Sequence, residues 1–295
     1  MKTIVFLSFL LLFQNCHSQP EHKLAGNSTS NTLLWEITGK DLKSPSYLFG
    51  TFHMMCKDDI KFSDNLLAAI KSTDEVYFEM DLDDASNTLG ALFFMNMKDG
   101  KTLHDFYSEK EYQKLEMYFK DSLRTSLKNF QKMKPSFLEA FLYPKMMPCK
   151  SMSGVEQELL KIAAKEKIEI KGFETIAFQA SVFDSISYKD QAKSLLNAID
   201  SIDKYKVAFD SMLKVYQSQQ IDQIETMFND SSFGVKDGLD ILLDKRNMNW
   251  VEQLKTILPA KNLFMAVGAG HLVGKNGLIE LLKKEGYTLR PLFNK

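Results

Sequence analysis

The sequence of 295 residues lacks any concentration of positive charge. Lys and Arg total 37 against 38 Asp and Glu, for a formal net charge of -1, and basic runs are no longer than Lys283-Lys284 on an ordinary helix face. A nucleic-acid-binding protein needs a concentrated positive field to neutralise phosphates. The composition therefore predicts no nucleic-acid partner.

Long apolar runs are also lacking once the first residues are passed. Residues 4–13 are almost without polar side chains and follow Met1-Lys2-Thr3, which is the pattern of a secretory signal peptide. The run is too short for a permanent membrane helix, which needs about 20 apolar residues. We therefore expect residues 1–19 to be a signal peptide and the chain to be exported as a periplasmic, secreted or membrane-anchored protein.

Two processing sites fit this signal. Cys16 closely follows the apolar run and is a candidate for a lipid anchor, in which case the signal ends before it, although Phe13-Gln14-Asn15 matches the lipoprotein pattern poorly. Cleavage near Gln19 by an ordinary signal peptidase fits equally well. Residues 20–31 are polar and predict a flexible tether. Contact with a membrane is expected only through the signal or the Cys16 anchor.

Cysteine is scarce: of three in the chain, only Cys56 and Cys149 are certain to remain after processing. Two cysteines in an oxidising compartment predict a disulfide, which by the loop-entropy argument would stabilise the fold by about 4–5 kcal/mol. Two alternatives stay open. The cysteines could be buried free thiols, or Cys56 could bind a metal ion together with His53, three residues before it.

A linker rich in Pro, Gly and Ser is absent from residues 32–295, so we predict one domain there. Apolar patterns indicate strands at 32–38, 47–49, 75–80, 168–173, 262–267 and 287–292. Helical spacing between them favours an α/β fold, with a mixed, largely parallel central sheet flanked by helices. Residues 86–167 would form a large helical insertion, and residues 177–258 a long helical tract.

Prolines and polar runs give local predictions. Pro144 should end the helix of residues 136–143, because a helix interior does not accept proline. Pro291 suggests that the last strand lies at a sheet edge, because it cannot donate to a ladder on both sides. The long helical tract should break near residues 229–232 and Gly234.

Four predicted strands end in chemically capable side chains: His53, Glu79, Glu174 and His271. In open α/β sheets, ligands bind outside the carboxyl ends of the strands. If the strands are parallel neighbours, these side chains converge on one edge. Each histidine follows a glycine in a Gly-x-x-His turn, and we expect Gly50, Gly268 and Gly270 to permit sharp turns and close approach of a ligand.

This set of side chains is compatible with two chemistries. Two neutral histidines and one carboxylate are a standard ligand set for a divalent metal ion. Without metal, the same residues could supply a general base and an acid. Taken alone, a histidine at a strand end is more often a hydrogen-bonding residue, but a matched pair of turns in a chain with few histidines favours function.

Arg246 is a further candidate. It lies four residues before Trp250, so the two share a helix face. An arginine at a site can hold a carboxylate or stabilise an oxyanion. On spacing alone, a solvent-exposed Arg246 above a core tryptophan is the preferred interpretation.

Taken together, these blocks resemble the TraB/GumN family, which includes the Tiki-type Wnt-inactivating proteases. The matching blocks, in order, are Tyr47-Leu48-Phe49-Gly50-Thr51-Phe52-His53, Glu79, Gly172-Phe173-Glu174-Thr175, Arg246-Asn247-x-x-Trp250 and Val267-Gly268-Ala269-Gly270-His271. The resemblance implies a core similar to the erythromycin esterase and ChaN-like folds.

In activity, the resemblance implies a metal-dependent peptidase that favours manganese or cobalt. Carried over by position, His53, Glu79 and His271 would bind the metal ion, and Glu79, Glu174 and Arg246 would take part in catalysis. We therefore expect an exported, metal-dependent hydrolase acting on a peptide or small-molecule substrate. The alternatives are a metal-free esterase-type hydrolase and a binding protein that does not turn its ligand over.

Overall fold

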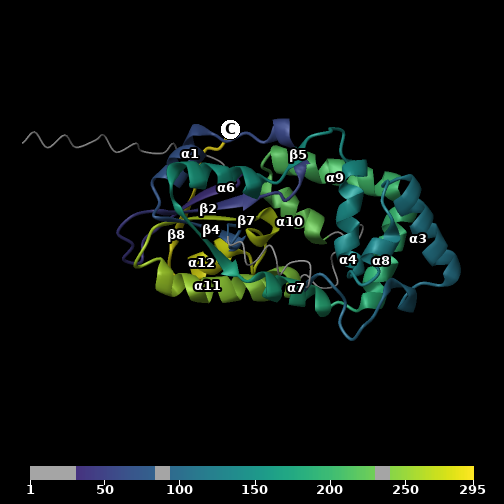
Figure 1. The fold of residues 1–295 in the computed structure, drawn as a ribbon. Coiled ribbons are helices and arrows are strands. Elements are labelled where there is room, and N and C mark those ends of the chain that lie inside the picture. The colour runs from purple at the N-terminus through teal and green to yellow at the C-terminus, as the bar shows by residue number, and fades with distance from the viewer. Residues whose placement is uncertain (1–30, 84–93, 230–239) are drawn as a thin grey trace, which may run out of the picture.

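The computed structural model describes residues 31–83, 94–229 and 240–295, which form a sheet covered by helices with a helical lobe at one end (Figure 1). The expected signal peptide, Cys16 and residues 20–30 of the expected tether lie outside these ranges. So do Gly234 and most of the expected break at 229–232. Within the described ranges, no helix is long and apolar enough to cross a membrane.

The central sheet formed by the described residues has six strands, in the order β6-β4-β7-β2-β1-β8. They are β1 (Leu34–Thr38), β2 (Ser46–Thr51), β4 (Glu75–Met80), β6 (Glu169–Glu174), β7 (Leu263–Gly268) and β8 (Thr288–Pro291). β6, β4, β7 and β2 are parallel neighbours, whereas β1 is antiparallel to both β2 and β8. The predicted mixed, largely parallel sheet is confirmed, and Pro291 lies on an edge strand as expected.

β7 lies inside the sheet and is buried on both faces. Phe264 and Ala266 belong to the core on one face, and Leu263, Met265 and Val267 to the core on the other, which is the period-two alternation of a strand. The first face is covered by α1 (Asp64–Lys71) and α6 (Val155–Glu166), and the second by α11 (Lys245–Ile257) and α12 (Leu278–Lys284) (Figure 1). The strand ends are thus held in a two-sided core.

The helical lobe is built from two segments of the chain. One segment supplies α3 (Glu109–Asp121), α4 (Pro135–Leu138) and α5 (Tyr143–Met146), and the other supplies α8 (Tyr188–Asp200) and α9 (Ile202–Gln217). α4 packs on α8, and α5 packs on α9. The expected insertion of residues 86–167 is therefore only one half of the lobe. Its last helix, α6, covers the sheet instead.

The long tract predicted for residues 177–258 is divided into separate helices. These are α7 (Ile176–Asp184), α8, α9, α10 (Ile221–Asn229), a π-helical turn (Asp240–Asp244) and α11. The first break lies between α7 and α8. Ser187 caps the start of α8, because its side chain accepts a hydrogen bond from the backbone N–H of Asp190. This serine cap separates α7 from α8, where apolar spacing alone suggests continuity.

The prediction for Pro144 was wrong. The predicted helix is three short pieces, α4, a 3-10 turn (Glu139–Leu142) and α5, and Pro144 lies in the first turn of α5. The first turn of a helix has no intrahelical acceptor for its N–H groups, so a proline is tolerated there. Four further 3-10 turns lie in the described residues, namely Lys57–Asp59, Leu103–Asp105, Leu127–Phe130 and Ala269–His271.

Candidate functional site

The strand order brings the four strand-end residues to one edge of the sheet. β6, β4, β7 and β2 are consecutive parallel neighbours, so Glu174, Glu79, His271 and His53 follow or lie near the carboxyl ends of adjacent strands. A cavity of about 430 Å³ opens at this edge and is lined by His53, Glu79 and His271, together with Arg246. Glu174 lies behind Arg246, with which it forms hydrogen bonds.

Gly268 keeps open the space between Glu79 and His53. A Cβ atom at this position would lie 3.2 Å from Glu79 Oε1 and 3.5 Å from His53 Nε2. Gly50 is needed for packing, because a Cβ atom there would lie 3.1 Å from the side chains of Leu33 and Leu272. Neither glycine has a positive φ. Glycine is therefore needed at both positions because neighbouring atoms approach the backbone closely. The sharp turns expected there form without a left-handed backbone conformation.

Arg246 is buried, which corrects the interpretation preferred from its spacing. Arg246 is the second residue of α11, and the residue is 8% exposed. Arg246 Nε and Nη2 both donate to Glu174, at 3.0 and 2.8 Å, and Nη2 also donates to Glu79 Oε2 at 2.6 Å. The guanidinium lies 5.0 Å from the ring centre of Trp250. Arg246 therefore joins two strand ends that each carry a carboxylate.

Glu174 serves as the anchor of this cluster. Besides the two bonds from Arg246, it accepts a hydrogen bond from Trp250 Nε1 at 2.8 Å and one from Gln179 Nε2 at 3.2 Å. Gln179, on α7, also donates to Glu79 Oε2 at 3.3 Å. Glu174 fixes Arg246 rather than facing the cavity.

Glu79 is the negative charge that faces the cavity. Burial would raise its pKa, but the neighbouring His271, His53 and Arg246 and the N–H of Gly268 lower the pKa of Glu79 to about 2. The Gly268 N–H donates to Glu79 Oε1 at 2.8 Å. Glu79 is therefore ionised throughout the physiological range.

His271 is neutral, with a defined tautomer. Burial and the nearby Arg246 and His53 lower the pKa of His271 to about 3, against the opposing effect of Glu79. Its Nδ1 lies 2.6 Å from Asn247 Oδ1, and the Asn247 amide nitrogen donates to the backbone oxygens of His271 and Asn276. The amide oxygen of Asn247 is thus the acceptor, so His271 carries its proton on Nδ1 and directs the lone pair of Nε2 toward Arg246 Nη1, 3.2 Å away.

His53 lies in the opposite electrostatic environment. Its side chain is open to the cavity and 71% exposed, yet its Nδ1 lies 2.7 Å from Glu156 Oε1. Burial within the cavity walls would lower the pKa of His53, but Glu156 and Glu79 raise it to about 9. Glu156 also accepts a hydrogen bond from Thr51 Oγ1 at 2.5 Å. His53 is therefore an imidazolium paired with Glu156 at neutral pH.

Sequence reasoning missed Asn247 and Glu156, the partners of the two histidines. Asn247 lies inside the Arg246-Asn247-x-x-Trp250 block, so its position was visible but its role was not. Glu156 lies in the first turn of α6, where acidic residues are common for reasons of helix stability. Nothing in its spacing indicates that it contacts His53.

The remaining lining of the cavity includes an apolar wall. Its side chains come from the loop after β2 and from α7, α9 and α10, the last two lying beside each other above the strand ends (Figure 1). They include Phe52, Val182, Phe183, Phe209, Met212 and Ile224. A cavity with one apolar wall and a few converging polar groups is typical of ligand-binding sites.

The side chains at this edge are of the types that bind divalent metal ions, but they are not close enough together to form a set of metal ligands. Both histidines have Nδ1 held by an oxygen acceptor, as ligating imidazoles do, and the space beside Gly268 lies between Glu79 and His53. Within the described residues, however, no three His, Cys, Asp or Glu side chains are close enough to hold an ion. Arg246 lies against His271 Nε2, where a third ligand bond would form.

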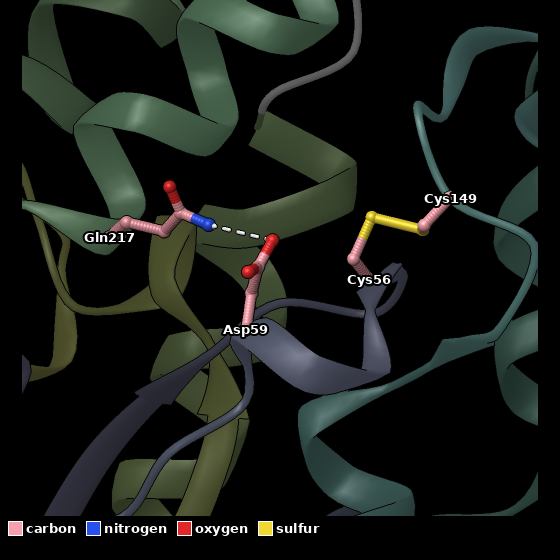
Figure 2. Close-up of a disulfide and its surroundings, with 4 residues drawn as sticks. All are labelled: Cys56, Asp59, Cys149 and Gln217. Atoms are coloured by element: carbon pink, nitrogen blue, oxygen red, sulfur yellow. Dashed lines mark hydrogen bonds between the residues drawn. A yellow bond between two sulfur atoms is a disulfide. The ribbon is translucent and has the colours of Figure 1, made fainter.

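Cys56 and Cys149 form a disulfide bond, which confirms that prediction (Figure 2). It leaves no free thiol at Cys56, so the alternative in which Cys56 binds metal with His53 is wrong. The bond joins the end of β3 (Met55–Cys56) to the segment before β5 (Met152–Ser153), and these two short strands pair antiparallel. His104 stacks on Tyr112 in the lobe and does not line the cavity.

The chain is similar in sequence to known proteins. The sequence model of the TraB/PrgY/gumN family matches residues 33–291. The chain is similar to Metalloprotease TIKI1 of Danio rerio, with 23% identity over 320 residues that cover 89% of this chain and 63% of the relative. The chain thus spans about 63% of that relative's length. No solved structure matches.

Proposed function

Because the chain belongs to the TraB/PrgY/gumN family, we propose that it is a metal-dependent hydrolase that cleaves a peptide bond in the cavity at the strand ends. The strongest support comes from the two histidines near ionised Glu79. The Nδ1 atom of His53 is hydrogen-bonded to Glu156, and that of His271 to Asn247. The relative named as a metalloprotease supports the same reaction class.

In this proposal, His53, Glu79 and His271 would hold the ion, manganese or cobalt by resemblance to the family. Such an ion lowers the pKa of a bound water and polarises a carbonyl oxygen. Glu79 supplies the negative charge, and Glu156 keeps the proton of His53 on Nδ1, so that Nε2 of His53 is the nitrogen that would face the ion. Arg246 directs positive charge at the same space and can stabilise an oxyanion, while Glu174 keeps Arg246 in place.

The apolar wall sets the kind of substrate that fits. Phe52, Phe209 and Met212 line the same cavity as the charged residues, and burying an apolar side chain against them would contribute about 25 cal/mol for each Å² removed from water. We propose that the substrate is a peptide, or a small molecule, with an apolar group beside the bond that is cleaved. No nucleic acid is expected as a partner, because the net charge is -1.

The contact of Arg246 with His271 favours a second candidate, a metal-free hydrolase of the esterase type. In it, Arg246 keeps its bond to His271 Nε2, and His53 acts as acid and base with its ring oriented by Glu156. This candidate predicts that activity survives exhaustive chelation. A third candidate, a binding protein without turnover, predicts stoichiometric binding and no product.

We also propose that the chain is exported through the signal in residues 1–19, with or without a lipid anchor at Cys16. The disulfide supports export, because disulfides persist in oxidising compartments. We further propose that the sheet and its flanking helices are related to the erythromycin esterase and ChaN-like folds. A search for the lipid by mass spectrometry on the protein purified from membranes distinguishes the two anchoring states.

The deciding experiment measures metal content and peptide cleavage together. Wild-type protein purified without chelator is compared with a His53→Ala/His271→Ala double variant, whose fold is checked by circular dichroism. Stoichiometric metal and cleavage in the wild type, both lost in the folded variant, are the expected results. Absence of bound metal even after exposure to Mn²⁺ and Co²⁺, with full activity in chelator, would overturn the proposal in favour of the metal-free hydrolase.

A further inference from the structure

The start of α6 lies directly against the backbone of His53. The N–H of Val155 donates to Phe52 O at 3.0 Å. A Cβ atom at Gly154 would come within 2.6 Å of His53 O, so only glycine allows this approach. The carboxylate of Glu156 therefore reaches the His53 ring from the element that touches the His53 backbone.

Glu156 can fix both the position of the His53 ring and its protonated nitrogen. Glu156 Oε1 accepts a hydrogen bond from Thr51 Oγ1 at 2.5 Å and lies 2.7 Å from His53 Nδ1. An ionised carboxylate accepts hydrogen bonds and cannot donate them. His53 must therefore carry a proton on Nδ1, which leaves Nε2 on the side of Gly268 and Glu79.

The disulfide fastens the two segments that carry this pair. Cys56 follows His53 by three residues, and Cys149 precedes Glu156 by seven. Between them, Met55 pairs with Ser153, Cys56 pairs with Met152, and Lys57 N donates to Ser151 O at 3.0 Å. The ribbon formed by β3 and β5 has only two residues in each strand and would be marginally stable alone. The disulfide therefore provides most of its stability.

The same ribbon also meets the apolar wall of the cavity. Gln217, at the end of α9, donates to Asp59 Oδ2 at 3.4 Å, just beyond Cys56 (Figure 2). Tyr216 donates to Gly50 O at 3.1 Å and its ring lies 5.1 Å from that of Phe52. The ribbon therefore lies between the segments that carry His53 and Glu156, and the residues just after it contact α9.

We propose that Glu156 is the positioning residue of His53, and that the Cys56–Cys149 disulfide holds the two in place, so that hydrolysis depends on the oxidised bond. This inference rests on the proposed function. A dithiol that reduces the bond gives two electrons and two protons to the cysteines, becomes a disulfide itself, and leaves the ribbon with its few hydrogen bonds alone.

The first test replaces Glu156 and follows both activity and the His53 ring. Glu156→Gln keeps the size and the oxygen acceptor but removes the charge, and loss of such a partner typically costs about 10–100-fold in activity or metal affinity. We expect kcat to fall by that factor with little change in KM. Glu166→Gln is the control, because Glu166 lies on the same helix and pairs with Lys71 at the surface. Its kcat should equal that of the wild type.

The spectroscopic readout needs no substrate. In the wild type, the Nδ1 proton of His53 should give a slowly exchanging, downfield ¹H resonance in the ¹⁵N-labelled protein, assigned by its absence in His53→Ala. We expect it to be retained in Glu166→Gln, and lost or broadened in Glu156→Gln. The few histidines of this chain make the assignment practical.

The second test removes the disulfide, by dithiothreitol and separately by Cys56→Ala/Cys149→Ala. In both cases we expect the His53 resonance to broaden and kcat to fall at least tenfold, with the circular dichroism spectrum retained. An unchanged resonance in Glu156→Gln, or in both disulfide-free proteins, would overturn the inference. If the resonance responds as expected but no protein cleaves peptides, the positioning stands and the proposed hydrolysis fails.

Discussion

Replacing Arg246 with Met should destabilise the fold strongly, because it leaves two carboxylates buried together. Arg246 donates to Glu79 and Glu174, and all three side chains are at most 13% exposed. Breaking a buried ion pair by removing one partner typically costs about 3–5 kcal/mol. Gln179 and the N–H of Gly268 still donate to the carboxylates, so we expect a loss near 3 kcal/mol, at the lower end of this range.

The loss should also depend on pH in a defined direction. The guanidinium is one of the groups that lower the pKa of Glu79 against the effect of burial. Without it, we expect Glu79 of the folded variant to take up a proton more readily, so the stability of the variant should fall as pH rises. Urea unfolding at pH 5 and pH 8, followed by tryptophan fluorescence, measures both effects. Lys255→Met, on the same helix and paired at the surface with Glu252 and Glu285, is the control and should change stability by less than about 1 kcal/mol. A loss below about 1 kcal/mol for Arg246→Met, equal at both pH values, would refute the reasoning.

Three further predictions follow from single contacts. Gly268→Ala places a methyl group between Glu79 and His53, so activity and metal binding should be lost while thermal unfolding changes little; an active variant would contradict this. Asn247→Leu removes the acceptor of His271 Nδ1, so kcat should fall about 10–100-fold, whereas an unchanged kcat would show that the tautomer does not matter. Burial raises the pKa of Glu139 to about 7, despite its bond from Ser194. The folded protein therefore keeps a proton that the unfolded chain loses above the ordinary glutamate pKa of 4.5, and stability should fall as pH rises from 4.5 to 7. Glu139→Gln should flatten that slope in urea unfolding, and an equal slope in both proteins would rule out Glu139 as its cause.

The strand ends could be predicted because their positions follow from local pattern. Apolar runs identify strands, and parallel neighbours place their carboxyl ends at one edge, so His53, Glu79, Glu174 and His271 could be named together before their order in the sheet was known. Membership of the TraB/GumN family, expected from the same blocks, is confirmed. What the four residues do remains a prediction.

The other parts of the site depend on contacts that local pattern does not contain. The spacing of Arg246 and Trp250 shows that they share a helix face, but not that this face packs on the sheet, which is why burial of Arg246 was missed. Glu156 meets His53 only because two-residue strands pair across a disulfide. Helical periodicity likewise predicts the helices of the lobe, but not that α4 and α8, from separate segments, pack together.

The two histidines differ in charge because their hydrogen-bonding partners differ. At neutral pH His53 is protonated, whereas His271 is neutral. A carboxylate behind His53 raises its pKa to about 9, whereas an amide behind His271, with Arg246 beside it, leaves the pKa of His271 at about 3. Two like groups whose pKa values are pushed apart by their surroundings indicate distinct chemical roles. His271 offers a permanent lone pair and does not exchange a proton near neutral pH. His53 is held in its protonated form by Glu156, the residue that we propose the disulfide keeps in place.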